Sequence, residues 1–265
     1  MDSHSIPAAL QARDTVAVTG GTGSFGQAFI QFLLSLPDPP RVRIISRDEY
    51  KQEQMQVRLP AGAGLTYILG DVRDSAHMQR ALDGADYVVH AAALKMVPAG
   101  ELHTAEFVRT NIIGAINIVN AAIECGVRHS LLISADKAVS PINAYGRCKA
   151  VAESLFAQGN IVGVSRHARF ACARGGNVWM SRGSVVERWW QASHGNREGE
   201  ISCPDATRFH LPMADWVGFC WRVLTDMRGG EVFVPRLRAW RLGDLAAAFE
   251  GLRYQEIGLR DGDKM

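Results

Sequence analysis

Residues 15–26 read TVAVTGGTGSFG, and this stretch decides the fold. The β-branched run at 15–19 is typical of a short strand. Gly20, Gly23 and Gly26 follow it, and apolar residues then recur at helical spacing. Strand, glycine loop and helix in this order predict a turn where the backbone approaches a pyrophosphate at a helix N-terminus. The alternative is a glycine-rich turn that binds nothing.

The alternation of strand and helix continues along the chain. Further strands are predicted at 42–45, 65–69, 87–90 and 130–134, and a helix from about residue 144 to 156. This order predicts an α/β fold with a doubly wound parallel sheet of the Rossmann type and helices on both faces. We assign residues 13–175 to this dinucleotide-binding domain.

The composition changes in the last third of the chain. All six tryptophans lie after Val178. We therefore expect residues 176–265 to form a smaller substrate lobe, with some segments returning to the Rossmann domain.

Composition and charge exclude several classes of protein. The 265 residues are 47% hydrophobic and 21% charged, with a net charge of +2, so disorder and general nucleic-acid binding are not expected. No apolar run approaches the roughly 18 residues of a membrane span, and the first 14 residues lack a secretion signal. The five cysteines are widely spaced, which indicates reduced thiols in a cytoplasmic protein. The eight histidines are scattered, so we predict no metal site.

The end of the second predicted strand bears on cofactor choice. It reads Ser46-Arg47-Asp48. An acid about twenty residues after the glycines would bind the ribose 2′-hydroxyl of NAD, whereas an arginine accommodates the 2′-phosphate of NADP. Arg47 favours NADP, and Asp48 keeps NAD open. The alternative for Arg47 is a solvated surface charge.

Reactive side chains gather between residues 134 and 149. Tyr145 and Lys149 are four residues apart on one helical face, where the ammonium would lower the tyrosine pKa and prepare a phenolate base. Asp136 and Lys137 follow the strand at 130–134 and could divide acid and base work. The alternative for that pair is a loop salt bridge.

The sequence resembles a known family over several ordered motifs. Besides the glycine loop these are SRDEYKQ (46–52), GDVRD (70–74), HAAALKMVP (90–98), residues 134–149, RGGNV (174–178) and SRGSVV (181–186). Together they resemble the inverting UDP-N-acetylglucosamine 4,6-dehydratases, which are extended short-chain dehydrogenases of nucleotide-sugar metabolism. The Asp136-Lys137 pair is the mark of the inverting branch.

The resemblance implies a mechanism. Tyr145 would take the proton of the sugar 4-hydroxyl while NADP⁺ accepts hydride from C4, and Lys149 would orient both. Lys137 would remove the C5 proton, and Asp136 would protonate the departing 6-hydroxyl. The product would be a 4-keto-6-deoxy sugar nucleotide with inverted C5.

The resemblance also implies binding roles and a homo-oligomer. Residues expected at the cofactor are Gly20, Gly23, Ser24, Phe25, Gly26, Ser46, Arg47, Asp71, Val72, Ala91, Ala92, Ala93, Tyr145 and Lys149, with Asp71 and Val72 beside the adenine. Residues expected at the UDP-sugar substrate are Lys95, Asn177, Arg182 and Arg208, with the two arginines on its diphosphate.

Three departures from the family pattern keep other functions open. Ala135 replaces a threonine, His210 stands where an aromatic residue is usual, and the chain ends at Met265 where the family continues. We therefore retain a truncated chain or a shortened relative acting on another sugar nucleotide. A sugar-nucleotide epimerase, a dehydratase of different regiochemistry and a non-catalytic NADP-binding sensor also stay open.

Overall fold

The structure is a computed structural model that describes residues 12–60, 62, 64–195 and 197–265. Residues 1–11, on which most of the predicted absence of a secretion signal rests, lie outside the described residues. Within the described part of the chain, no helix has both the length and the apolar character that crossing a membrane requires.

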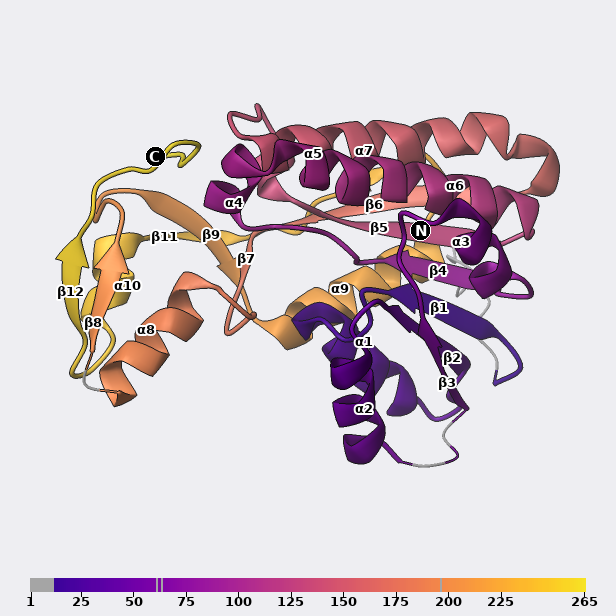
Figure 1. Ribbon diagram of the computed structural model, residues 1–265, viewed down its shortest axis with the longest axis horizontal. Helices are drawn as coiled ribbons and strands as arrows, with labels where there is room; N and C mark the ends of the chain where they lie inside the picture. Colours follow the sequence, from indigo (N-terminus) through magenta and orange to yellow (C-terminus); the bar gives the residue numbers. More distant parts are fainter. Residues whose placement is uncertain (1–11, 61, 63, 196) are drawn as a thin grey trace, which may run out of the picture.

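A seven-stranded sheet forms the centre of the part that the structure describes (Figure 1). All of its strand pairs are parallel. From one edge to the other the strands are β10 (Val232–Phe233), β6 (Arg169–Gly175), β5 (His129–Ala135), β4 (Tyr87–His90), β1 (Thr15–Thr19), β2 (Arg41–Ser46) and β3 (Leu65–Leu69). The order reverses between β4 and β1, which places the switch point of a doubly wound sheet beside the glycine loop. The predicted fold class is confirmed.

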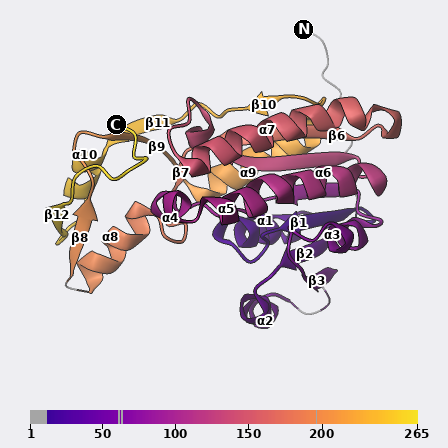
Figure 2. The same cartoon turned by 45° about the horizontal axis from the view of Figure 1, so that its top comes forward.

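Helices cover both faces of this sheet, as Figure 2 shows. One face carries α1 (Ser24–Leu34), α2 (Glu49–Arg58) and α9 (Met213–Asp226), and the other carries α3 (Ser75–Leu82), α6 (Gly114–Glu124) and α7 (Ala144–Val162). Phe29 of α1 and Trp216 of α9 are buried in the first core, and Phe156 of α7 is buried in the second. The segments α4 (Val97–Leu102), α5 (Thr104–Phe107) and the π-helix η1 (Val108–Ile113) connect β4 to α6.

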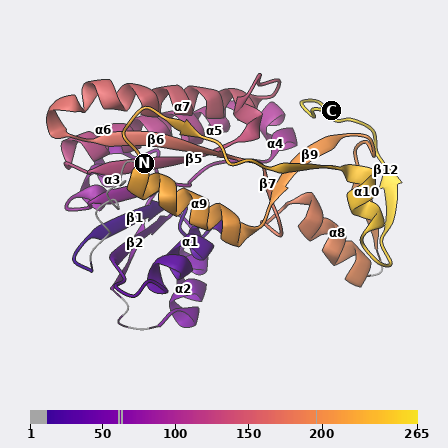
Figure 3. The ribbon, with the colours of Figure 1, turned by 180° about the vertical axis from the view of Figure 1, so that it is seen from behind.

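A smaller unit lies beyond the carboxyl ends of the central strands (Figure 1). It contains a three-stranded sheet, a strand pair and two helices: β11 (Arg238–Arg241), β9 (Thr207–Leu211), β7 (Asn177–Val178), β12 (Arg253–Glu256), β8 (Glu198–Ile201), α8 (Val185–His194) and α10 (Leu242–Ala247). Its own core is built around Val186, Trp189 and Leu245. Between these elements the chain returns to the large sheet through α9, seen from behind in Figure 3, and through β10, labelled in Figure 2. A division of the chain at residue 175 stays a prediction.

The sequence patterns located β1 to β5 to within a residue or two but did not identify β6 and β10. The sequence of β6, RFACARG, has only a short apolar run of mostly small residues between two arginines, and β10 is only two residues long. The helix predicted to end near residue 156 extends to Val162. Gly159 allows this extension to pack on β6, because a Cβ there would lie 3.0 Å from the Phe170 ring.

Candidate active site

A cavity of about 640 Å³ opens between the carboxyl ends of the parallel strands and the smaller unit. The glycine loop forms one wall, and the segments after β4 and β5 and the start of α7 form the next. The smaller unit contributes the 176–188 segment, β8 and β9. This is the place where ligands bind to open doubly wound sheets.

Close backbone packing explains two of the three loop glycines. Gly20 has a φ of +67°, and a Cβ there would lie 2.7 Å from the backbone nitrogen of Ala92. A Cβ on Gly26 would lie 2.6 Å from the carbonyl oxygen of Gly20. A Cβ on Gly23 would meet only that same oxygen, at 3.1 Å, so its other side is open. Gly23 also precedes α1 without a side-chain cap, and the first turn of α1 carries no acid, which leaves a favourable site for an anion.

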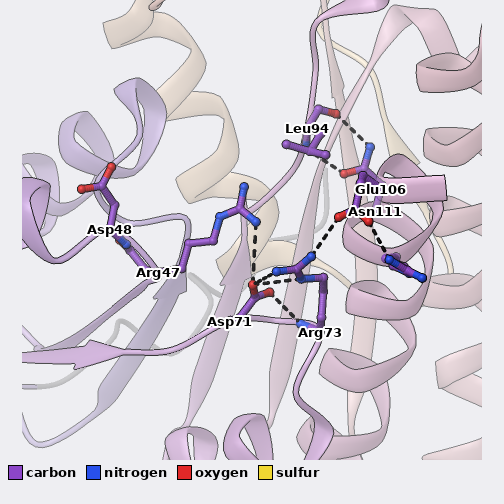
Figure 4. A network of polar contacts seen from close by, with 9 residues as sticks. Arg47, Asp48, Asp71, Arg73, Leu94, Glu106 and Asn111 are labelled. Carbon is purple, nitrogen blue, oxygen red and sulfur yellow. Dashed lines mark hydrogen bonds and ion pairs between the residues drawn. The ribbon is translucent and has the colours of Figure 1, made fainter. Parts of the chain in front are cut away.

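At the end of β2, Arg47 and Asp48 are placed differently (Figure 4). The Asp48 carboxylate caps α2 by accepting from the Lys51 backbone, and it also pairs with the Lys51 ammonium. The Arg47 guanidinium, whose side chain is half exposed, points towards Asp71, with Nη1 3.7 Å from Oδ2. Ser46 is buried, and its hydroxyl exchanges a 2.9 Å hydrogen bond with Thr22 of the glycine loop.

Asp71 and Val72 follow β3 and lie in different environments. Burial raises the pKa of Asp71, but hydrogen bonds from Arg73 and the charge of Arg47 outweigh it, so the net shift is downward. The Asp71 carboxylate is therefore an acceptor that Arg73 already holds, at 2.6 Å from Nη2 (Figure 4). Val72 is buried in the core, where it packs against Gly114.

One residue that the sequence analysis missed holds the loop after β4. The side chain of Asn111, in the π-helix η1, accepts from the Leu94 backbone nitrogen and donates to the Leu94 carbonyl, both at 2.8 Å (Figure 4). This double hydrogen bond fixes the loop between Ala93 and Lys95, both of which line the cavity. A lone asparagine in a helical pattern gives no signal of such a role.

Tyr145 and Lys149 both lie on α7, are buried and line the cavity. Burial lowers the pKa of Lys149 to about 8, and its ammonium donates to the Ile133 carbonyl at 2.8 Å. Burial, with the charge of Asp136, raises the pKa of Tyr145. The expectation that Lys149 lowers the tyrosine pKa is therefore wrong for this structure, because desolvation of the phenolate outweighs the attraction of an ammonium directed to the backbone.

Asp136 and Lys137 lie directly after β5, in the short 3-10 helix η2 (Asp136–Ala138). Lys137 Nζ is 2.9 Å from Asp136 Oδ1 and donates to Asn177 Oδ1 at 2.7 Å. Lys137 and Asn177 line the cavity, while Asp136 is absent from the lining. The ammonium is thus held between a carboxylate on η2 and an amide of the smaller unit.

An ion pair between Glu153 and Arg174 holds α7 against the sheet. Glu153, four residues after Lys149, accepts from Arg174 at 3.0 and 2.5 Å and from the Ser134 hydroxyl at 2.5 Å. The contacts join α7 to β5 and β6 just beneath the cavity. The sequence analysis did not identify Glu153 or Arg174 in this role, since nothing in their spacing indicates that they meet.

Cations concentrate where the smaller unit and the loop after β4 line the cavity. Lys95, Arg182 and Arg208 line it, and burial lowers the pKa of both Lys95 and Arg208. The Arg182 backbone nitrogen donates to Ser24 Oγ at 2.9 Å, which joins the smaller unit to the glycine loop. The lining also includes His210 and the Arg260–Asp263 ion pair, which the sequence analysis did not place there.

Most of the predicted site residues line this one cavity. These are Gly20, Gly23, Ser24, Phe25, Gly26, Ala91, Ala93, Lys95, Lys137, Tyr145, Lys149, Asn177, Arg182 and Arg208. The others lie outside its lining: Ser46, Arg47, Asp71, Val72, Ala92 and Asp136. Arg47 borders a second cavity, of about 440 Å³, at the end of β2. No cluster of three metal-ligating side chains occurs among the described residues.

Sequence relatives identify the family. A profile of the family described as "Polysaccharide biosynthesis protein" matches residues 16–265. A UDP-N-acetylglucosamine 4,6-dehydratase (inverting) of Campylobacter jejuni is 38% identical over 255 residues, which are 96% of this chain and 76% of the relative. The chain belongs to this family. The predicted resemblance to the inverting dehydratases, and with it the prediction of an enzyme, is confirmed.

Relatives with a second activity match equally well in identity. A UDP-glucose 4-epimerase of Rickettsia bellii is 38% identical over 258 residues, or 94% of this chain and 75% of the relative.

Solved structures share the fold. The X-ray structure of Pen from Bacillus thuringiensis superposes with a TM-score of 0.91 at 30% identity, covering 97% of this chain and 82% of that one. The dTDP-glucose 4,6-dehydratase DesIV from Streptomyces venezuelae, with NAD and TYD bound, superposes with a TM-score of 0.84 at 20% identity, covering 94% and 86%.

Proposed function

We propose that this protein dehydrates a UDP-N-acetylhexosamine to a 4-keto-6-deoxy sugar nucleotide with inversion at C5, using NADP. The observation that carries the proposal is the contact between Asp136 and Lys137, because Lys137 lines the same cavity as Tyr145 and Lys149. An acid–base pair and a tyrosine hydroxyl at one cavity are what elimination of water from a sugar requires.

The residues around the glycine loop fit a dinucleotide. Gly23 is open on the side of the cavity, and the N-terminus of α1 offers backbone N–H groups without a competing side chain. Gly20 and Gly26 let strand, loop and helix pack closely enough to keep that approach clear. A nicotinamide cofactor bound there would accept hydride from C4 and return it to C6.

Tyr145 and Lys149 would act on the proton of the sugar 4-hydroxyl. Because burial and Asp136 raise the pKa of Tyr145, its phenol is protonated in the structure described, and it is suited to hydrogen-bond the sugar oxygen. The same phenol must lose its proton before it can accept one. Lys149 has a pKa lowered to about 8, so it is the neighbouring group that can change charge near neutral pH. Its ammonium also orients the helix face through the Ile133 carbonyl.

Lys137 and Asp136 would act on C5 and C6. Lys137 lines the cavity and would remove the C5 proton, while Asp136 would protonate the departing 6-hydroxyl. Their 2.9 Å contact lets the proton move between the two groups. The Asn177 amide, 2.7 Å from Lys137, would hold the base at the sugar.

The surroundings of β2 support NADP over NAD. Asp48 is already bound to the backbone and ammonium of Lys51, so its carboxylate is less available to a ribose hydroxyl. Arg47 is half exposed, and its ion pair with Asp71 is long, at 3.7 Å. We expect Arg47→Ala to weaken NADP binding by roughly 10- to 100-fold, the value of a charge-assisted hydrogen bond, and to leave NAD binding unchanged.

Titration of protein fluorescence with NADPH and NADH measures this preference. Arg166→Ala is the matched control, since Arg166 is an exposed arginine in the 3-10 helix after α7 and lines neither cavity. Equal losses of affinity for NADPH and NADH in Arg47→Ala would contradict the proposed role of Arg47 at the 2′-phosphate.

Two cationic groups support a nucleoside diphosphate on the substrate side. Arg182 and Arg208 lie on the wall of the smaller unit, and Lys95 faces them from the loop after β4. Guanidinium groups pair with diphosphate oxygens in bidentate geometry.

A homo-oligomeric state and a cytoplasmic location stay predictions.

Mass spectrometry in heavy water tests the reaction. Wild-type protein incubated with UDP-N-acetylglucosamine should yield a product lacking one water and carrying one solvent deuterium at C5. Lys137→Ala should abolish deuterium exchange at C5 while cofactor binding persists. Exchange at the wild-type rate in that variant would refute the role of Lys137.

The Rickettsia relatives support 4-epimerisation as the second candidate. An epimerase would change the sugar configuration without loss of mass and without C5 exchange. Chromatographic separation of the 4-epimers in the same samples therefore decides between the two reactions.

A further inference from the structure

His210 is a buried polar residue that the proposed mechanism does not use. Its side chain is 5% exposed, and neither ring nitrogen has a hydrogen-bond partner among the described residues. A buried imidazole without partners costs free energy comparable to a lost hydrogen bond. Such a group calls for a partner from outside the protein.

The position of His210 in β9 directs it into the cavity. Side chains alternate along a strand, so Arg208 and His210 share one face of β9, and both line the cavity. His210 pairs in register with Asn177 of β7, whose amide holds Lys137. On its other side the ring meets Trp179 edge-on, with 5.9 Å between ring centres. The imidazole thus lies near the Asp136–Lys137 pair and lines the same cavity.

The charges around the imidazole keep it neutral. Burial, together with the cations Lys137 and Arg208, lowers the pKa of His210 to about 4, although Asp136 opposes this shift. At neutral pH the ring therefore has one N–H donor and one acceptor nitrogen. A sugar hydroxyl or an acetamido group offers the complementary acceptor and donor.

We propose that His210 is a sugar-recognition residue whose neutral imidazole hydrogen-bonds a ring substituent of the hexose, next to Lys137. This inference rests on the proposed function and adds the residue that discriminates the sugar from the nucleotide. The cations Arg182 and Arg208 would hold the diphosphate, and His210 would recognise the hexose alone.

Comparison of three ligands isolates this contact. Calorimetric titrations with UDP, UDP-glucose and UDP-N-acetylglucosamine give the ratio of each sugar-nucleotide Kd to that of UDP. His210→Phe keeps the ring contact with Trp179 but removes both polar nitrogens. We expect the Kd ratio to rise roughly three- to tenfold for this variant, the worth of one neutral hydrogen bond, while the Kd of UDP stays unchanged.

Two further variants separate recognition from structure. His210→Asn and His210→Gln carry an amide near the positions of Nδ1 and Nε2, and at least one of them should restore the ratio. Phe209→Leu is the matched control, because Phe209 lies on the opposite face of β9 and outside the cavity lining. It should leave every Kd unchanged. If His210→Phe loses affinity equally for both sugar nucleotides, His210 contacts a hydroxyl that the two sugars share. If the loss of affinity is confined to UDP-N-acetylglucosamine, His210 contacts the acetamido group.

Several outcomes overturn the proposal. If the Kd ratio of His210→Phe stays within twofold of the wild-type ratio, His210 does not contact the sugar. If the variant loses as much affinity for UDP as for the sugar nucleotides, its role is structural. A wild-type protein that binds sugar nucleotides but releases no water contradicts the proposed function and leaves the His210 comparison readable. A wild-type protein that binds no sugar nucleotide overturns both.

Discussion

Replacement of Glu153 by glutamine tests whether the catalytic helix is held by a buried ion pair. Glu153 is 7% exposed and accepts three hydrogen bonds, two from Arg174 and one from Ser134. Glutamine has the same shape but presents an amide N–H₂ where an arginine already donates. The substitution therefore leaves the Arg174 charge without its counterion.

The expected cost follows from the burial of the two partners. Removal of one member of a buried pair costs about 3–5 kcal/mol. The Arg174 side chain retains 24% exposure, so water recovers part of this cost, and we expect a loss of about 2–3 kcal/mol in unfolding free energy. For a chain of this size that corresponds to a fall in Tm of roughly 5–10 °C.

Thermal and urea unfolding followed by circular dichroism measure the effect. Glu106→Gln is the matched control, because Glu106 pairs with Arg73 and Arg109 at the surface and should cost less than about 0.5 kcal/mol. The double variant Glu153→Gln/Arg174→Met should lose less unfolding free energy than the two single variants lose together, with a coupling of about 1–3 kcal/mol. A loss no larger than that of Glu106→Gln, or additive single changes, would refute the reasoning.

Two further predictions concern the buried lysine and the glycine loop. Between pH 8 and 10.5 the unfolded chain holds a proton on Lys149 that the folded chain has released, so unfolding free energy should rise with pH over this window. In urea titrations, the increase in unfolding free energy across this pH window should be larger in the wild type than in Lys149→Met by up to about 3 kcal/mol. Parallel plots of unfolding free energy against pH for the two proteins would contradict the lowered pKa. Gly26→Ala should lower Tm by roughly 5 °C or more, because its Cβ would overlap the Gly20 carbonyl. Gly23→Ala should keep its Tm but lose cofactor affinity in fluorescence titration, and the reverse pattern would contradict the roles assigned to these glycines.

The local sequence patterns predicted the central sheet because they report on burial. The strands β1 to β4 are fully or partly buried apolar runs, and a doubly wound sheet buries both faces of its strands. The patterns failed at β6, whose apolar run, Phe-Ala-Cys-Ala, is short, mostly small and flanked by arginines. These four residues are buried between α7 and α9, and this cover by neighbouring helices was not visible in the local pattern.

The site shows the same division. The glycine loop, Asp136-Lys137 and Tyr145 with Lys149 are local motifs, so the sequence predicted that they belong to one site. The pKa of Tyr145 was not predicted correctly, because spacing reports that Lys149 is near but not that burial and Asp136 dominate. Likewise Ser46 and Asp71 engage Thr22 and Arg73, contacts that no spacing rule contains.

By itself the sequence determined the fold class, the family and the local motifs that carry the proposed reactive groups, because strands, loops and helix faces are encoded by residues close together in the chain. The tertiary structure decided the arrangement of groups far apart in sequence. It brought Asn177 to Lys137, Arg174 to Glu153, and His210 to the same cavity wall. The Arg174–Glu153 contact depends on the packing of α7 on β6, and the other two depend on the return of the chain through β7 and β9 to the ends of the parallel strands. Charge and hydrogen-bonding capacity in the cavity are therefore properties of the folded protein.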